Sequence, residues 1–180
     1  DFVALGGAII KRGIFRQKSA GGGSTITQQL AKQLYSGTAH SVMERMLQKP
    51  IEWVIAVQLE RNYTKDEIIA MYLNYFDFLH NAVGIKTASN TYFGKEPKDL
   101  TVNEAATLIG LCKNPSYFNP VRHHDRSQER RNVVLGQMVK AGYLTEAQYQ
   151  QYSAEPLKLN FHVADHKDGV AVYFRDYLRR

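Results

Sequence analysis

Helix-start signals recur along the chain, and each leads into a segment whose apolar residues lie three or four positions apart. In a capping box, a Ser or Thr side chain accepts a hydrogen bond from a backbone N–H, and a Glu or Gln three residues later bonds back. Four such pairs are present, at Thr25 and Gln28, Thr64 and Glu67, Thr101 and Glu104, and Thr145 and Gln148. Each pair predicts the start of a helix.

Two more helices are predicted on weaker signals. Asp125 with Gln128 is a looser variant of the same cap, and Gly142 predicts the end of the helix that follows. Pro50 fits the first turn of another helix, because proline is tolerated where no backbone donor is needed. That helix would have an apolar side made of Ile51, Val54, Ile55 and Leu59.

Little in the sequence predicts β-structure. Only residues 157–163 alternate apolar and polar side chains cleanly enough to suggest a strand. With 180 residues and 44% hydrophobic composition, the chain has the size and makeup of one compact domain, and the helix signals predict that this domain is mainly α-helical. No apolar run approaches the about 18 residues that a membrane-spanning helix needs.

Positive charge is concentrated in the N-terminal third. Residues 1–49 contain seven basic and two acidic side chains, so their net charge of +5 is most of the +6 of the whole chain. Apolar side chains are interleaved with these cations, which suits an anionic membrane surface or a phosphorylated ligand. Nucleic acid is disfavoured, because neither a stripe of stacking aromatics nor a nucleic-acid motif accompanies the charge. A solvated basic face without a partner is the remaining alternative.

The clearest candidate site is a glycine run, residues 21–23, followed by Ser24 and the helix start at Thr25. A helix start presents unpaired backbone N–H groups and the positive end of the helix dipole, so an anion is its natural ligand. Lys32 lies two turns along the same helix and could bring an ammonium group to the same anion. A flexible hinge ahead of a helix would explain the glycines equally well.

A second candidate is Lys49 with Glu52, preceded one turn earlier by Arg45. Residues three apart share a helix face, so the ammonium and the carboxylate can meet. On an exposed surface such a pair contributes only about 0.3–0.5 kcal/mol. In a cleft, the carboxylate could instead orient a sugar hydroxyl or hold a metal against a pyrophosphate.

The cysteine and histidine residues predict no metal centre. Cys112 has no partner cysteine in the chain and is predicted to be a small core residue. The six histidines lack the paired spacing of metal ligands, and the adjacent His123 and His124 would point apart on a helix.

Together, these stretches resemble the peptidoglycan glycosyltransferase family, the polymerising part of class A penicillin-binding proteins and of monofunctional transglycosylases. Residues 22–29 are similar to the family's second signature without a mismatch. Residues 49–52 resemble the third, Arg-Lys-x-x-Glu, with Gln48 where arginine is usual, and residues 65–74 resemble the fourth, with Ala70 in place of a common glutamate. Further matches follow in the familiar order at residues 84–85, 92–95, 104–106 and 119–122.

The resemblance implies a lysozyme-like helical domain over residues 1–180, with a smaller membrane-associated subdomain formed largely by the early residues. It implies a place on the periplasmic or other extracytoplasmic face of a bacterial inner membrane, anchored by an N-terminal helix that this chain lacks. Residues 166–180 would lead toward a transpeptidase domain that is also missing.

For such an enzyme the resemblance implies lipid II and the growing glycan strand as substrates. The acceptor hydroxyl attacks the anomeric carbon of the strand and expels polyprenyl pyrophosphate, with inversion. Lys32, Arg45 and Lys49 would hold the pyrophosphate, where fixed positive groups act most strongly. Glu52 would position acceptor groups or a divalent ion, Mg or Mn. The other implied substrate-binding residues are Ser24, Thr25, Gln28 and Gln29.

The family's first signature, Glu-Asp-x-x-Phe-x-x-His-x-Gly-x-Asp, is matched only by Asp1. The glutamate regarded as the catalytic base would lie upstream of this residue. We therefore expect the 180-residue chain to bind substrate poorly and not to polymerise glycan, whereas a full-length parent protein should.

Two other functions remain open. A glycan hydrolase or lytic transglycosylase of related helical fold would use Glu52 as a general acid, but it has no use for a cationic anion site at Lys32 and Lys49. A non-catalytic lipid- or wall-binding module would bind its ligand without turnover. Extension of a lipid-linked precursor, as opposed to cleavage of polymeric glycan, separates the transferase from the hydrolase.

Overall fold

The computed structural model describes residues 25–35 and 41–163, and within them the protein is mainly helical, as predicted. The chain divides between Tyr75 and Phe76 into two compact units, unit 1 and unit 2. No strand is present in the described ranges, where the one β feature is an isolated bridge between Asp77 and Val83.

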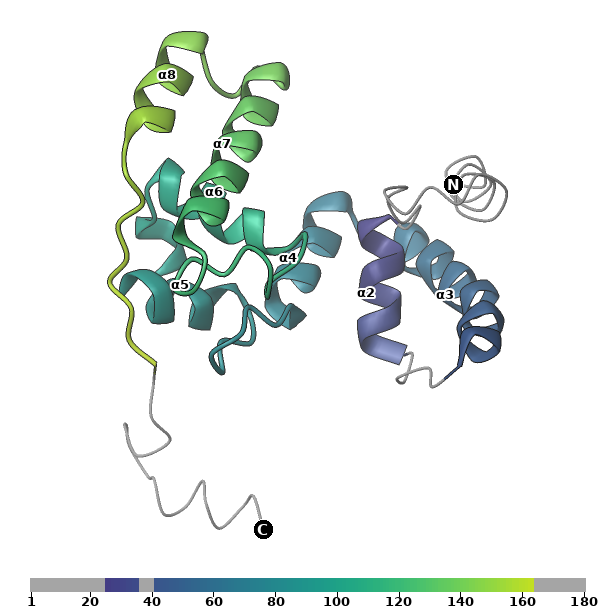
Figure 1. The fold of residues 1–180 in the computed structure, drawn as a ribbon. Coiled ribbons are helices and arrows are strands. Elements are labelled where there is room, and N and C mark those ends of the chain that lie inside the picture. The colour runs from purple at the N-terminus through teal and green to yellow at the C-terminus, as the bar shows by residue number, and fades with distance from the viewer. Residues whose placement is uncertain (1–24, 36–40, 164–180) are drawn as a thin grey trace. The chain divides into compact units, whose positions relative to one another are not determined.

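In unit 1 the described residues form three helices, α2 (Ile26–Tyr35), α3 (Val42–Asn62) and α4 (Lys65–Tyr75). α2 packs against both α3 and α4, and its place beside α3 is visible in Figure 1. Leu30 and Ala31 of α2 are fully buried. This packing brings the two segments that carry the candidate site residues into one unit.

α3 begins at Val42, so the predicted helix start at Pro50 is wrong. The N-cap is Ser41, whose hydroxyl accepts a hydrogen bond from the backbone N–H of Glu44 at 3.1 Å. Pro50 therefore lies inside the helix. An interior proline costs about 3 kcal/mol, and the strong helix formers between Val42 and Pro50, together with the cap, offset part of that cost.

The predicted apolar side of α3 is buried only in part. Ile51 and Val54 are 58% and 63% exposed, whereas Glu52, Ala56 and Leu59 are buried. The buried residues lie three or four apart on the side that packs within unit 1. On the exposed side the helix carries an apolar strip, which we call the α3 strip: Met43, Met46, Leu47, Ile51 and Val54.

Unit 2 contains, among its described residues, α5 (Ile85–Phe93), the short 3₁₀ helix η2 (Pro97–Asp99), α6 (Val102–Leu111), α7 (His124–Lys140) and α8 (Glu146–Ala154). α7 packs against both α6 and α8, and its place beside α8 is visible in Figure 1. The core of the unit is apolar and aromatic. Its fully buried side chains include Phe78, Tyr92, Leu108, Leu111 and Leu135.

All four predicted capping boxes are confirmed. The reciprocal bonds are present at Thr25 and Gln28, Thr64 and Glu67, Thr101 and Glu104, and Thr145 and Gln148. Such caps succeed as sequence signals because they depend only on residues three apart.

The start of α7 is two residues earlier than a cap at Asp125 would require. Its N-cap is His123, which makes no side-chain capping bond, and Asp125 lies inside the first turn, where a carboxylate favours the helix dipole. The end of α7 is as predicted. Gly142 follows the last residues of the helix with φ +79°, and its N–H donates to the carbonyl of Val139.

Residues 157–163 are extended, but they do not form the predicted strand. The backbone N–H groups of Asn160 and His162 donate to the carbonyls of Tyr92 and Thr91 at 3.0 and 2.8 Å. These carbonyls belong to the last turn of α5, where carbonyl groups have no backbone N–H partner within the helix. The alternating pattern thus reflects a segment that packs along a helix end instead of pairing with another strand.

Three consecutive non-glycine residues take left-handed backbone conformations between the bridge partners of unit 2. Leu79, His80 and Asn81 have φ values of 69°, 53° and 61°. The turn is held by bonds from Leu79 N–H to the Asp77 carboxylate at 2.8 Å and from Ala82 N–H to the Leu79 carbonyl at 2.8 Å. Residues with a Cβ atom are strained in the left-handed conformation, so these hydrogen bonds must hold the backbone there.

Candidate functional site

Lys49 and Glu52 form a close ion pair on α3. The Lys49 Nζ lies 2.5 Å from the Glu52 Oε2, in the i, i+3 arrangement that the sequence predicts. The Glu52 side chain is only 1% exposed, while that of Lys49 is 25% exposed. The pair is therefore not the solvated surface bridge that a lysine and a glutamate three apart usually form, and Lys49 is its solvent-facing member.

Thr25 and Gln28 close the first turn of α2. The Thr25 hydroxyl accepts from the Gln28 N–H, and the Gln28 Oε1 accepts from the Thr25 N–H, both at 3.3 Å. Gln28 is 7% exposed. Its carbonyl oxygen is thus committed to the cap, and a ligand near this helix start would meet backbone N–H groups more readily than that oxygen.

Gln29 ties α2 to α4 through a tyrosine that sequence reasoning missed. The hydroxyl of Tyr72 donates to the Gln29 Oε1 at 3.1 Å, and Tyr72 is 5% exposed. Tyr72 lies four residues after the buried Ile68, so helical spacing was the available signal for its burial. The hydroxyl contact with Gln29 depends on how α2 and α4 pack, which spacing within one helix does not encode.

The remaining predicted site residues fall into two groups. Lys32 lies exposed in the last turn of α2, one helix over from the Lys49 and Glu52 pair. The glycine run at 21–23, Ser24 and the side chain of Arg45 lie outside the described part of the chain, as do the early basic residues and residues 166–180. The structure thus packs the helix of Thr25 and Lys32 against the helix of Lys49 and Glu52.

A divalent ion fits poorly at Glu52. One of its carboxylate oxygens is already paired with the Lys49 ammonium, and a metal bound there would face that positive charge at close range. Among the residues that the structure describes, no three His, Cys, Asp or Glu side chains gather into a metal-binding group.

Cys112 has the character of a packing residue. Burial raises the pKa of its thiol to about 12, despite the nearby positive charge of Arg130, so the thiol stays protonated at neutral pH. The Sγ donates to the Leu108 carbonyl at 3.7 Å, within the hydrogen-bonding range of sulfur. Nothing in this arrangement resembles an activated nucleophile.

Comparisons with known proteins agree with the signatures read from the sequence. A protein-family model described as Transglycosylase matches residues 1–139. Penicillin-binding protein 1F of Bacillus subtilis is 40% identical over 173 residues, which cover 94% of this chain and 23% of that protein. Penicillin-binding protein 1A of Escherichia coli is 39% identical over 152 residues, or 84% of this chain and 17% of that protein.

Among solved structures, penicillin-binding protein 1A from Haemophilus influenzae matches with 31% sequence identity and a TM-score of 0.47, over 67% of this chain and 18% of that one. The chain spans about a fifth of the length of the curated relatives it matches.

Proposed function

Because the chain belongs to the transglycosylase family, we propose that it is a peptidoglycan glycosyltransferase that polymerises lipid II into glycan strands and releases polyprenyl pyrophosphate. The relatives are named penicillin-binding proteins and are several times longer. We therefore propose that residues 1–180 act as the polymerising domain of a longer protein, whose transpeptidase domain follows residues 166–180.

The observation that supports this proposal best is the ion pair of Lys49 with the buried Glu52 in unit 1. The leaving pyrophosphate develops negative charge, which fixed cations stabilise without reorganising. Glu52 holds the Lys49 ammonium in one place, and Lys49 is open enough to reach a ligand. Lys32 lies on α2, which packs against the helix of Lys49. A second cation there would suit a pyrophosphate, while a hydrolase acting on neutral glycan has no need of one.

In the proposed mechanism each residue of the chain has a defined task. Lys32, Lys49 and Arg45 neutralise the pyrophosphate, and the backbone N–H groups at the start of α2 receive its oxygens. Glu52 is a positioning residue, because its contact with Lys49 sets where that charge lies. The proton of the attacking hydroxyl passes to the carboxylate that the first signature supplies in this family. Ser24, Thr25, Gln28 and Gln29 shape the helix start around the ligand.

Membrane contact at the extracytoplasmic face of a bacterial inner membrane is part of the proposal. The exposed apolar side chains of the α3 strip lie on the same helix as Lys49, which suits an enzyme that takes a lipid-linked substrate from the bilayer. In the described portion of the chain, no helix has the length and apolarity needed to cross a bilayer. The strip would therefore lie against the membrane surface.

Lipid II polymerisation by the protein that contains this chain tests the assignment. We expect long glycan strands on gels from lipid II and no cleavage of preformed peptidoglycan. Cleavage of peptidoglycan without extension of lipid II would show that the protein is a hydrolase and not a transferase. Binding of lipid II without either product would show a non-catalytic binding module.

Substitution of Glu52 tests its role. Glu52→Gln removes the charge that holds Lys49 and should lower kcat about 100-fold, the scale of losing one preorganised electrostatic contact. Glu52→Asp should restore part of kcat. Glu60→Gln, an exposed carboxylate on the same helix, is the matched control and should leave kcat unchanged. A wild-type kcat for Glu52→Gln in folded protein would rule the role out.

A further inference from the structure

Two arginines of α7 lie over two aromatic rings of the preceding loop in unit 2. The Arg126 guanidinium is 4.6 Å from the centre of the Tyr117 ring, and that of Arg130 is 5.7 Å from the centre of the Phe118 ring. The two rings meet edge to face at 4.9 Å. Because the arginines are four residues apart, they lie on one face of the helix. We call Arg126 and Arg130, the rings of Tyr117 and Phe118, and the exposed Arg122 at the end of the same loop the arginine platform.

Hydrogen bonds of Asn119 order the loop of the platform. The Asn119 carboxamide oxygen accepts from the N–H groups of Val121 and Arg122 at 2.9 and 3.3 Å, and Asn119 is 2% exposed. Its amide group meets the His80 Nε2 at 3.1 Å, which fixes the loop to the left-handed turn. A surface ordered in advance loses little conformational entropy when it binds.

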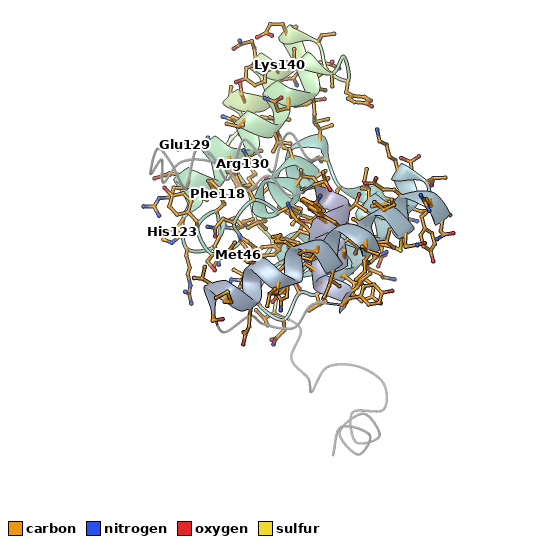
Figure 2. The ribbon with its side chains drawn as sticks, turned by 90° about the vertical axis from the view of Figure 1, so that its right-hand side faces the viewer. Met46, Phe118, His123, Glu129, Arg130 and Lys140 are labelled. Carbon is orange, nitrogen blue, oxygen red and sulfur yellow. The ribbon has the colours of Figure 1, made fainter. Side chains whose placement is uncertain are left out.

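Arg130 is also held from the α6 side. A Cβ added at Gly110 would lie 3.1 Å from the Arg130 Cγ, so the glycine leaves the space that the arginine stem occupies. Figure 2 shows Arg130 near Phe118 and His123 at one end of α7, with Lys140 at the other end. The platform is thus a local feature of the first half of α7.

The charge of the platform is not neutralised within the described residues. Arg122 and Arg126 are exposed, and no ion pair found there includes either guanidinium. The nearby acids are Asp125, which lies 3.9 Å from the His124 Nδ1, and Glu129. A guanidinium stacked on a ring still presents its N–H edge outward, the geometry that binds phosphate oxygens in pairs.

Apolar side chains accompany these cations. Tyr117 is 49% exposed and Val121 is 42% exposed, so the platform mixes cationic, aromatic and aliphatic groups on one surface. This mixture is typical of protein surfaces at the headgroup level of a bilayer. Single-stranded nucleic acid would need free ring faces for base stacking, but an arginine already lies over one face of each ring.

We propose that the arginine platform of unit 2 docks on the phosphate groups of anionic phospholipids at a bilayer surface, with Tyr117 and Val121 entering the headgroup layer. The proposal does not depend on the glycosyltransferase assignment, because it uses none of the residues assigned to that reaction. It adds a contact to the membrane surface that is separate from the α3 strip and from the basic N-terminal third.

Vesicle binding by the full chain tests the platform. The variant Arg122→Gln with Arg126→Gln is compared with the control Lys98→Gln with Lys140→Gln, which removes the same charge from exposed lysines elsewhere in unit 2. On phosphatidylglycerol vesicles each platform arginine should contribute about fivefold to binding, so the double variant should bind about 25-fold more weakly. The control should change binding less than threefold, and neither variant should bind neutral phosphatidylcholine differently from the wild type.

Equal losses in the two double variants would overturn the proposal, because they would show a nonspecific effect of net charge. An unchanged affinity of the arginine variant would overturn it as well. Inorganic phosphate is the second arm of the test. Titration with phosphate that shifts the NMR signals of Arg122 and Arg126, with no platform effect on vesicles, would show a free-phosphate site instead of a membrane contact.

The position of the contact is tested by fluorescence. The wild-type chain has one tryptophan, Trp53, so Tyr117→Trp adds a single new reporter and keeps a ring beneath Arg126. Lipids brominated near the headgroup should quench this variant more strongly than the wild type. Equal quenching of the two proteins would place Tyr117 away from the bilayer and refute the docking orientation.

Discussion

Substitution of Asn81 tests whether the left-handed turn of unit 2 stores strain. Asn81 is exposed, so exchanging its side chain changes backbone preference while removing little packing. Its φ of 61° lies in the region that costs most L-residues about 1–2 kcal/mol, and asparagine tolerates it better than others. Asn81→Ala should therefore cost about 1 kcal/mol. The β-branched Asn81→Val should cost about 2 kcal/mol.

Asn81→Gly should be nearly neutral. Glycine enters the left-handed region freely, but it also gives the unfolded chain about 0.5–1 kcal/mol of extra conformational freedom. For a chain of this size, 1 kcal/mol corresponds to about 2–4 °C in Tm. Thermal unfolding followed by circular dichroism should thus give glycine and asparagine similar Tm values, with alanine and then valine lower.

Gln137→Ala is the control, because Gln137 is an exposed residue of α7 where alanine has the higher helix propensity. It should leave Tm unchanged or slightly raised. If Asn81→Ala and Asn81→Val both left Tm unchanged, the backbone at this position would not be strained, and the argument from φ would be refuted.

Three further predictions concern side chains of unit 2. Arg131→Met should lower the free energy of unfolding in urea by about 3–5 kcal/mol, because the buried guanidinium donates to the carbonyls of Ser153 and Glu155 at the C-terminal end of α8. Burial raises the pKa of Glu104, but hydrogen bonds from Lys95 and from the cap of α6 lower it by more. The net pKa is therefore below its ordinary value of 4.5. The stability that this carboxylate contributes is present above pH 4.5 and is lost as pH falls through its folded-state pKa. In Glu104→Gln, the free energy of unfolding in urea should therefore depend less on pH below 4.5 than in the wild type. Gly110→Ala should push against the Arg130 stem and lower Tm despite the better helix propensity of alanine, as a thermal melt would show.

Local signals in the sequence predicted local structure well. The four capping boxes and the glycine end of α7 depend on residues a few positions apart, and all are present. The contact between Lys49 and Glu52 was predicted correctly as well, because the i, i+3 spacing on a helix nearly fixes it.

Features set by packing between elements were not predictable in the same way. Pro50 was a sound start signal, yet the cap at Ser41 starts the helix earlier and leaves the proline inside. The apolar side predicted for α3 is buried at Leu59 but exposed at Ile51 and Val54, because packing within unit 1 buries a different set of α3 residues. The burial of Glu52 and the bond between Tyr72 and Gln29 follow from that packing, which no periodicity within α3 reveals.

The cap at the start of α2 changes how a mutational scan of this region should be interpreted. Alanine at Thr25 or Gln28 would remove reciprocal bonds that close the first turn, so lost activity would report an unwound helix end as readily as a missing ligand contact. Thr25→Ser keeps a hydroxyl acceptor and Gln28→Glu keeps the returning carbonyl-type oxygen. Only exchanges of that kind can separate a lost ligand contact from a lost helix cap at these two positions.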